Sequence, residues 1–358
     1  MNQTRTDYDR LPADAAAVFG FDAGSADRLP GHEGGRNVVY AVGTDSVLRI
    51  SNLTDRTIED YLAETEYVHY LASHGAAVAD VLPSLSGKTV EILKDGGCAY
   101  AVSMFERAKG DQLADHGYQY KDDAPIEELW YNTGKTLGAI HALSRLYHPT
   151  VKRFDFFDKY NESYFDALIP DDLTCPLLGE APIGRQIKLQ MHVLLEQLRA
   201  LPADVSRCGM IHFDFSDGNY NIDYTDGTVT AFDFDNCRTG RYMFDLANLW
   251  AHGVGWAAWN DDPEERKQFM ERYFRQICAG YRSQAALTED MLEELPLLLD
   301  TVYMENIIDE FEVQLSETGT LSCDGEQAYR IKCLLENIPY LGFFSDIYNS
   351  SVPFDLDS

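Results

Sequence analysis

Basic residues are scarce in this sequence, and their scarcity argues against two classes of partner. The chain has 358 residues, with 29 Lys and Arg against 59 Asp and Glu, which gives a formal net charge of −30. Such a surface repels the phosphates of nucleic acids and of anionic membranes, so we expect neither as a partner. The carboxylates are either a plain solvated surface or a field that attracts a cationic substrate.

Paired cysteines and long apolar runs are also missing. The seven cysteines form no C-x-x-C pair, which predicts neither a disulfide framework nor a thiolate zinc site. No stretch approaches the roughly 20 apolar residues that cross a bilayer. The opening MNQTRTDYDRLPADAAAVFGF lacks the charged and apolar regions of a secretory signal. We therefore expect a cytoplasmic protein, and 45% hydrophobic residues are ordinary for a globular one.

The order of strand and helix patterns predicts an α+β chain. NVVYAV (37–42) with SVLRI (46–50), and TVEIL (89–93) with CAYAVSMF (98–105), read as two hairpins. One helix is expected between them, from about 57 to 73. Beyond residue 110 the spacing of apolar residues becomes helical. The predicted helices are 125–146, 184–201, one that starts at 262, 288–317 and 325–340.

Polar side chains that suit phosphoryl transfer lie on the turns of a small group of strands. The strands are predicted at 209–213, 220–224 and 228–234, and HFDFSDGN (212–219) lies between the first two. Asp214 and Asn219 are five residues apart across a turn, and Asp233 ends the last strand. Amide and carboxylate oxygens are ligands that Mg²⁺ prefers, together with the phosphates of a nucleotide. Asp214 is then left to accept a proton from an attacking hydroxyl.

These motifs together resemble the aminoglycoside phosphotransferase family. The resemblance rests on H-x-D-x-x-x-x-N at 212–219, on Asp233 and on D-L-A at 245–247, and it extends over roughly residues 30 to 255. That family has a protein-kinase-like fold and includes choline, homoserine and fructosamine kinases.

The resemblance implies a bilobal α+β molecule with two domains. Residues 1–107 would form a small antiparallel-sheet lobe that binds nucleotide, and residues 108–358 a larger, mainly helical lobe for catalysis and substrate binding. It also implies Mg²⁺ as the metal, ATP or GTP as the phosphate donor and a small-molecule alcohol as the acceptor.

Carried over by position, the resemblance assigns roles around the phosphates. Asp214 resembles the catalytic base, and Asn219 and Asp233 resemble the magnesium ligands. Asp235 is either an auxiliary metal contact or a structural residue. Arg49 would contact the nucleotide phosphates.

The partner of Arg49 should be an acid on the helix at 57–73. Glu64 is the expected partner because it shares a face with Val68 and Leu71, and Glu66 is the alternative on the opposite face.

Two further segments would contact the nucleotide. Backbone groups of Glu106 and Ala108 resemble the hinge that binds adenine. Gly34 and Gly35, with Gly31, either form a loop over the phosphates or a simple turn.

Two departures from the family pattern favour a small substrate over a protein. Phe213 stands where the family often has Gly and where protein kinases have Arg. Asp245 follows Asp233 by only 12 positions, which leaves too little chain for a regulated activation segment. His212 is expected to be a core residue. Asp245 is expected to cap the helix that continues through Trp250 and to brace the loop at 212–219.

Two other functions remain as alternatives. One is a non-catalytic pseudokinase that binds nucleotide on the same fold. The other is a metal-dependent hydrolase using Asp214, Asp233 and Asp235, which would need histidine ligands in the same site, where the sequence offers only His212.

The C-terminal helices are acidic and hint at an acceptor that carries an amine, held by carboxylates and by cation–π contacts. The residues behind this hint are Asp261, Asp262, Glu264, Glu265, Glu289, Asp290, Glu293, Glu294, Glu305, Asp309, Glu310 and Glu312, together with Trp250, Trp256 and Trp259.

Overall fold

The computed structural model describes residues 10–30, 36–54, 56–257, 260 and 262–336. Its contacts divide the chain into two compact units, and each is made of several segments. The first unit comprises Met1–Ala124, Leu146–Phe154 and Asp217–Cys237, and the second comprises Pro125–Arg145, Asp155–Ser216 and Arg238–Ser358.

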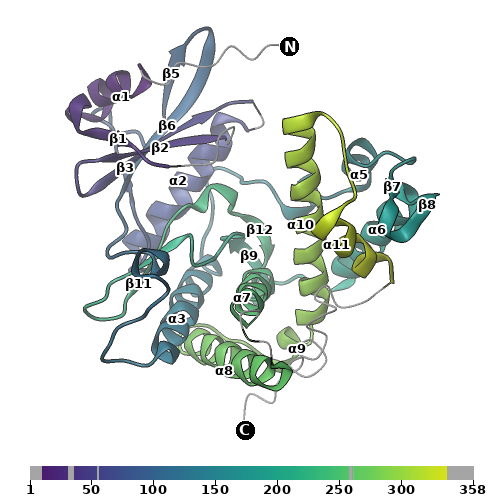
Figure 1. Ribbon diagram of the computed structural model, residues 1–358. Helices are drawn as coiled ribbons and strands as arrows, with labels where there is room; N and C mark the ends of the chain where they lie inside the picture. The colour runs from purple at the N-terminus through teal and green to yellow at the C-terminus, as the bar shows by residue number, and fades with distance from the viewer. Residues whose placement is uncertain (1–9, 31–35, 55, 258–259, 261, 337–358) are drawn as a thin grey trace. The chain divides into compact units, whose positions relative to one another are not determined.

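The first unit carries an antiparallel sheet and the second is mainly helical (Figure 1), so the chain is α+β, as predicted. The division at residue 107 stays a prediction. No helix among the described residues has both the length and the apolar content needed to span a membrane.

The sheet of the first unit contains both predicted hairpins. Its strands lie in the order β1-β2-β3-β6-β4, and β5 also pairs with β6. Every pair is antiparallel. The strands are β1 (Ala26–Arg28), β2 (Asn37–Val42), β3 (Ser46–Asn52), β4 (Val81–Leu82), β5 (Glu91–Asp95) and β6 (Cys98–Glu106).

The alternation of side chains along β3 fixes which face of the sheet carries Arg49. Leu48 and Ile50 are fully buried in a cluster with residues of helix α1 (Leu11–Phe19). Side chains that follow one another in a strand point to opposite faces. Arg49 therefore points to the other face, where helix α2 (Ile58–Ser73) supplies Tyr61 to a separate apolar cluster.

Helix α2 begins at a capping box and buries one face. The Thr57 hydroxyl accepts from the Asp60 N–H, and the Asp60 carboxylate accepts from the Thr57 N–H, which satisfies two donors at the helix start. Val68, Leu71 and Glu64 are buried, on the face that the sequence predicted.

The strands around residues 208–241 differ from the single group that was predicted. The structure pairs β10 (Tyr220–Ile222) with β11 (Val229–Ala231) in the first unit. It pairs β9 (Cys208–Ile211) with β12 (Arg238–Arg241) in the second. The prediction of one three-stranded group was therefore wrong. The sequence of β12, RTGR, has no apolar alternation that could have revealed it.

The helices of the second unit match most of the predicted ranges. One predicted helix, 288–317, is broken near Glu294, and Pro296 lies in the first turn of the helix that follows, where a missing N–H costs little. The predicted helix 325–340 is described only as far as Glu336. The helices are α3 (Ile126–Ser144), α4 (Phe156–Lys159), α5 (Glu162–Leu168), α6 (Gly184–Ala200), α7 (Tyr242–Ala257), α8 (Pro263–Arg282), α9 (Glu289–Leu292), α10 (Leu295–Thr318) and α11 (Gly325–Glu336), with the short strands β7 (Thr174–Cys175) and β8 (Gly179–Pro182) between α5 and α6.

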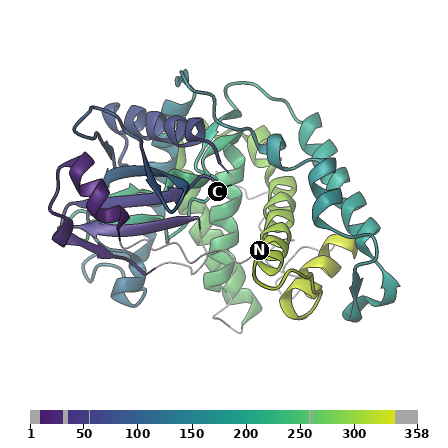
Figure 2. The same cartoon turned by 90° about the horizontal axis from the view of Figure 1, so that it is seen from above.

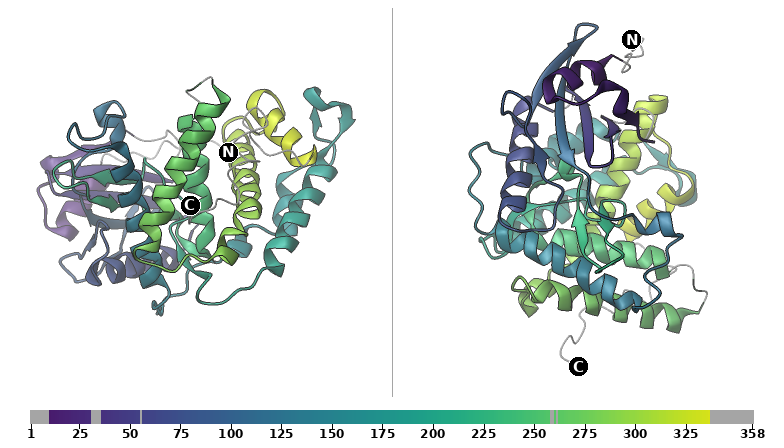
Figure 3. Two further views of the ribbon diagram at one scale, coloured as in Figure 1. Left: turned by 90° about the horizontal axis from the view of Figure 1, so that it is seen from below. Right: turned by 90° about the vertical axis from the view of Figure 1, so that its left-hand side faces the viewer.

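Two helix pairs organise the second unit. Helices α7 and α10 lie side by side (Figure 2). Helices α3 and α8 approach so closely that their backbones meet (Figure 3, right). A Cβ added to Gly134 would lie 2.0 Å from the carbonyl oxygen of Ile277, and one added to Gly280 would lie 1.9 Å from that of Tyr131. Glycine is required at both positions because any side chain would force the helices apart.

Gly280→Ala should therefore destabilise the protein, although alanine is the better helix former. Separating α3 from α8 is expected to lower the free energy of unfolding by about 1–3 kcal/mol. The matched control is Gly255→Ala in α7, where an added Cβ meets nothing within 4 Å. That change should leave stability unchanged or raise it by up to about 1 kcal/mol. Urea unfolding of both variants measures the difference, and equal effects would contradict the packing account.

Candidate active site

A buried ion pair joins the sheet of the first unit to helix α2. Two guanidinium nitrogens of Arg49 donate to the two carboxylate oxygens of Glu64, each at 2.7 Å. The side chains are 6% and 0% exposed. Arg49 thus pairs with Glu64, the acid that was expected. The alternative, Glu66, instead accepts hydrogen bonds from Thr150.

The surroundings of Arg49 keep it charged. Burial works against the guanidinium charge, but Glu64 and Asp235 outweigh that effect and raise the pKa of Arg49. The rings of Phe105 and Tyr61 lie 5.0 and 5.8 Å from its central carbon, in the range of cation–π contacts. Arg49 is therefore a fixed positive charge in a dry environment, where it acts strongly on a nearby anion.

Asp233 lies next to this pair but has different surroundings. One of its oxygens is 3.8 Å from Arg49, and the side chain is 49% exposed. Neighbouring protein atoms raise the pKa of Asp233 by desolvation, and Asp235 and Glu64 add to the rise, whereas Arg49 opposes it. Its backbone is left-handed, with φ 58° and ψ 63°, a conformation that costs a non-glycine residue about 1–2 kcal/mol. This strained turn leaves the carboxylate half-exposed.

The β10–β11 hairpin brings Asn219 alongside Asp233. Tyr220 pairs with Ala231, and the Phe232 N–H donates to the Asn219 carbonyl at 2.9 Å. Asn219 is thus opposite Phe232, the residue that precedes Asp233, although Asn219 and Asp233 are 14 positions apart in the chain. An amide and a half-exposed carboxylate provide hard oxygen donors that fit a Mg²⁺ site.

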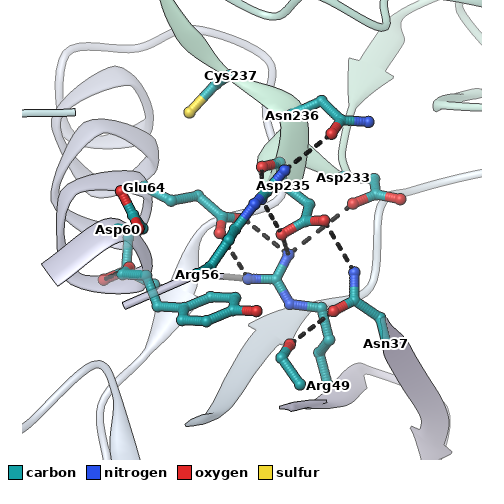
Figure 4. Close-up of polar contacts among 12 residues, drawn as sticks. Asn37, Arg49, Arg56, Asp60, Glu64, Asp233, Asp235, Asn236 and Cys237 are labelled. Atoms are coloured by element: carbon teal, nitrogen blue, oxygen red, sulfur yellow. Dashed lines mark hydrogen bonds and ion pairs between the residues drawn. The ribbon is translucent and has the colours of Figure 1, made fainter. Parts of the chain in front are cut away.

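Asp235 has a different environment from Asp233. Its side chain is 7% exposed, and its oxygens accept from Arg36 and Arg56 at 2.6 Å and from Asn37 at 3.1 Å. Figure 4 draws Arg56, Asn37 and Arg49 around this carboxylate. Burial disfavours its charge, but the arginines outweigh burial and hold the pKa of Asp235 well below its usual range. Of the two readings left open for Asp235, this environment favours the structural one.

In the second unit, a buried aspartate shapes the start of the segment 212–219. The two oxygens of Asp245 accept the N–H groups of His212 and Phe213 at 2.9 and 2.8 Å. His141 lies 3.1 Å from the same carboxylate. Asp245 therefore braces the loop, as predicted. The cap prediction was wrong, because α7 starts at Tyr242 and Asp245 lies within its first turn.

The conformation of Phe213 explains why the family often has glycine there. Its φ is 73°, which glycine adopts at no steric cost. Phe213 is held by packing: its ring stacks on Phe244 at 4.5 Å, and the Arg238 guanidinium lies 3.4 Å from its centre. Its carbonyl accepts from Asn248 at 2.7 Å. The next residue, Asp214, is exposed, and His212 is fully buried, as expected.

The segments expected to contact the nucleotide base and phosphates are only partly described. The Glu106 N–H donates to the Asp80 carbonyl, and the Ala108 carbonyl accepts from Asn221. The adenine contacts expected of Glu106 and Ala108 stay a prediction. Gly31, Gly34 and Gly35 lie outside the described residues.

A second acidic cluster lies on helix α10 of the second unit. Glu305 accepts from the Tyr160 hydroxyl at 3.2 Å, and Glu312 pairs with Lys159 at 2.9 Å. Burial and the nearby Asp309 raise the pKa of Glu305 to about 7. Of the tryptophans expected near a substrate, Trp250 is a core residue that is 1% exposed, so that expectation was wrong. Trp259 is outside the described residues.

Three arginines of the first unit had no role predicted from the sequence: Arg36, Arg56 and Arg153. All three contact Asp235 through its side chain or its carbonyl. No local pattern connects Arg153 to a residue more than eighty positions away. Arg36 could have been found from the sequence, because it directly follows Gly34 and Gly35, which were expected to form either a loop over the phosphates or a simple turn.

In the first unit a buried arginine pairs with a helix acid, and a hairpin carries Asn219 and ends near a half-exposed aspartate. In the second unit an aspartate braces the loop before an exposed Asp214. These features are typical of a kinase-like phosphotransferase. The model of the phosphotransferase enzyme family matches residues 28–287. The chain belongs to this family. It is an enzyme that transfers a phosphoryl group to a hydroxyl of a small molecule.

Known relatives agree in sequence and fold. The amicoumacin kinase of Bacillus subtilis (strain 168) is 28% identical over 305 residues, 83% of this chain and 82% of that one. A solved amicoumacin kinase, hAmiN in complex with AMP-PNP, Ca²⁺ and Ami, superposes with a TM-score of 0.79 at 22% identity, covering 99% and 98% of the two chains. A microcompartment-associated aminopropanol kinase gives 0.65 at 16% identity, covering 97% and 99%.

Removing one partner of the Arg49–Glu64 pair should destabilise the first unit. Glu64→Gln leaves a buried guanidinium short of counter-charge, and Arg49→Met leaves a buried carboxylate, so each should cost about 3–5 kcal/mol. The double variant should lose less than the sum of the two. Urea unfolding of all four proteins measures this coupling.

The exposed pair of Arg185 and Asp171, at 2.7 Å, is the control, and Asp171→Asn should change stability little. Strictly additive losses for Arg49 and Glu64 would contradict a coupled buried pair.

Proposed function

We propose that this enzyme transfers the γ-phosphate of a magnesium-bound nucleoside triphosphate, ATP or GTP, to a hydroxyl of a small amine-bearing acceptor. The observation that supports the proposal is the hairpin register that pairs Asn219 with Phe232, the residue before the half-exposed Asp233, whose carboxylate lies 3.8 Å from the buried cation Arg49. The relative known as an amicoumacin kinase, and the solved complex of another with AMP-PNP and Ca²⁺, support the choice of donor.

In the proposed reaction, Asp214 accepts the proton of the acceptor hydroxyl as its oxygen forms a bond to the γ-phosphorus. The bond between the γ-phosphorus and the β–γ bridging oxygen breaks, and the nucleoside diphosphate leaves with that oxygen. Asp245 contributes by holding the backbone immediately before Asp214 through the His212 and Phe213 N–H groups. Arg49 holds the phosphates of the donor, and Glu64 fixes the position of Arg49.

Asn219 and Asp233 would hold the magnesium ion, which when bound offsets the charge of the phosphates. Asp233 suits this role because its side chain is 49% exposed and its oxygen lies 3.8 Å from the Arg49 guanidinium, farther than in a direct hydrogen bond. The hinge residues Glu106 and Ala108 would bind the base through their backbone groups.

The acidic cluster on α10 supports an acceptor with a positive charge. A chain of contacts within the second unit leads from this cluster toward Asp214. Glu305 binds the Tyr160 hydroxyl, and the ring of Tyr160 lies 6.4 Å from that of Phe213, the residue before Asp214. An ammonium group held by Glu305 and its neighbours would therefore bind in the same unit as the proposed base. The name of the aminopropanol kinase is consistent with an amine-bearing acceptor.

We also propose that the enzyme works in the cytoplasm. All seven cysteines are free thiols, including the buried Cys175, Cys237 and Cys278. Free buried thiols suit a reducing compartment, and that compartment also supplies nucleoside triphosphates.

Asp214→Asn should abolish transfer while nucleotide binding persists. The amide cannot accept the hydroxyl proton, so kcat is expected to fall by about 10²–10⁴-fold. The Kd of AMP-PNP, measured by calorimetry, should change less than threefold. Asp217→Asn, three residues further along the same turn, is the control and should keep kcat within about threefold. Transfer by Asp214→Asn at the rate of the parent would refute the role of the base.

Glu305→Gln should weaken the binding of cationic acceptors selectively. Loss of one charged contact is expected to raise KM for an amino alcohol about tenfold, with little change for a neutral alcohol. Glu317→Gln, at the exposed C-terminal end of the same helix, is the control.

The parent should also lose kcat/KM for the amine as pH falls from 8 to 6, because Glu305, with a pKa near 7, becomes neutral. Asp309 and Lys159 face the same carboxylate with opposite effects. The Glu305→Gln variant should show a flatter profile. An equal KM for cationic and neutral acceptors in the parent would remove the basis of this proposal.

A further inference from the structure

Four arginine side chains converge on one residue, Asp235, within the first unit. Arg36 and Arg56 bind its carboxylate, and Arg49 lies 4.0 Å from it. Arg56 and Arg153 also donate to its backbone carbonyl. The acids of the cluster are Glu64, Asp233 and Asp235, so four cations face three carboxylates. This local excess of positive charge is unusual in a chain with a net charge of −30.

Hydrogen bonds already occupy the carboxylate of Asp235. Oδ2 accepts from Arg36 at 2.6 Å and from Asn37 at 3.1 Å, and Oδ1 accepts from Arg56 at 2.6 Å. A carboxylate has about four lone-pair positions, and Arg49 lies beside the remaining one. With only 7% of the side chain exposed, Asp235 has little access for a metal ion, whereas Asp233 is 49% exposed.

Arg36 differs from the other arginines in its exposure. Its side chain is 26% exposed, against 6% for Arg49 and 7% for Arg56. It comes immediately before β2, and its neighbour Asn37 binds the same oxygen of Asp235 and accepts from Ser51 at 2.7 Å. Asp235 thus fixes Arg36 at the start of a strand, beside the carboxylate that Arg49 also approaches, while the Arg36 side chain stays 26% exposed.

We propose that Asp235 is a positioning residue that holds Arg36 beside Arg49 as a second cation for the nucleotide phosphates, and that it is not a metal ligand. This inference rests on the proposed function. Two guanidinium groups on one carboxylate create a site where a polyphosphate gains charge-assisted hydrogen bonds. Asp235 reduces the repulsion between the arginines, and Asp233 remains for the metal. The two acids of the D-F-D sequence therefore have different roles.

Arg36→Gln tests the phosphate contact by direct binding. Loss of one charge-assisted hydrogen bond is expected to weaken Mg·AMP-PNP about tenfold in calorimetry. AMP, which lacks the outer phosphates, should be affected much less. Arg28→Gln, an exposed arginine on strand β1 of the same sheet, is the matched control and should bind like the parent. A loss of fivefold or more for AMP-PNP supports the proposal, and a smaller loss overturns it.

Asp235→Asn and Asp233→Asn test the division of roles. Binding of Mn²⁺ to the complex of protein and AMP-PNP can be followed by electron paramagnetic resonance. Asp233→Asn is expected to weaken Mn²⁺ at least tenfold, whereas Asp235→Asn should leave it within threefold and weaken AMP-PNP instead. Equal weakening of Mn²⁺ by both variants would overturn the positioning role. If Asp235→Asn does not fold, the Arg36→Gln result alone decides.

The same measurements separate this inference from the proposed function. If the parent binds no nucleotide, the proposed function fails, and the inference fails with it. If the parent binds AMP-PNP and Mn²⁺ normally but Arg36→Gln binds equally well, only the role of Arg36 and Asp235 is refuted.

Discussion

The rest of the site depends on the need to neutralise a buried guanidinium. Arg49 is turned away from the α1 face of the sheet by the alternation of β3, and it is almost inaccessible to water. A buried charge without a partner is expensive, so the fold must bring acids to it. Glu64 comes from α2, and Asp235 and Asp233 come from the end of the β10–β11 hairpin. One electrostatic requirement thus draws together three segments that lie far apart in the sequence.

The two acids of the D-F-D sequence, Asp233 and Asp235, differ in their arginine contacts and in their exposure. Asp235 is bound by Arg36 and Arg56, which leaves it ionised and enclosed. Asp233, two residues earlier, adopts a left-handed backbone that leaves its carboxylate half-exposed. The strain of this turn is offset by the network around it, as is common at functional sites. A second strained residue, Phe213, is held by packing and by the Asp245 brace, and it precedes the proposed base.

Much of the fold followed from local patterns, and the part that did not depends on distant contacts. The hairpins of the first unit, the face of α2 and the pairing of Arg49 with Glu64 were predictable, because period-two and period-3.6 spacing fixes them. The pairing of β9 with β12 was not, since RTGR carries no alternating pattern. The expectation for Trp250 was wrong because its side chain is buried in the core. A tryptophan in a helix faces either the core or the solvent, and its position in the sequence does not show which. The binding of Arg36, Arg56 and Arg153 to Asp235 joins residues 82 to 199 positions apart, which no local spacing indicates.

The most direct measurement is a crystal structure of the enzyme with Mg·AMP-PNP. We expect Mg²⁺ at about 2.0–2.1 Å from an oxygen of Asp233 and from the Asn219 amide oxygen. Asp235 should keep its contacts with Arg36 and Arg56, and Arg49 should still pair with Glu64. A metal ion bound to Asp235, with Asp233 bound to Arg36 and Arg56 instead, would show that the roles of the two aspartates are the reverse of those proposed.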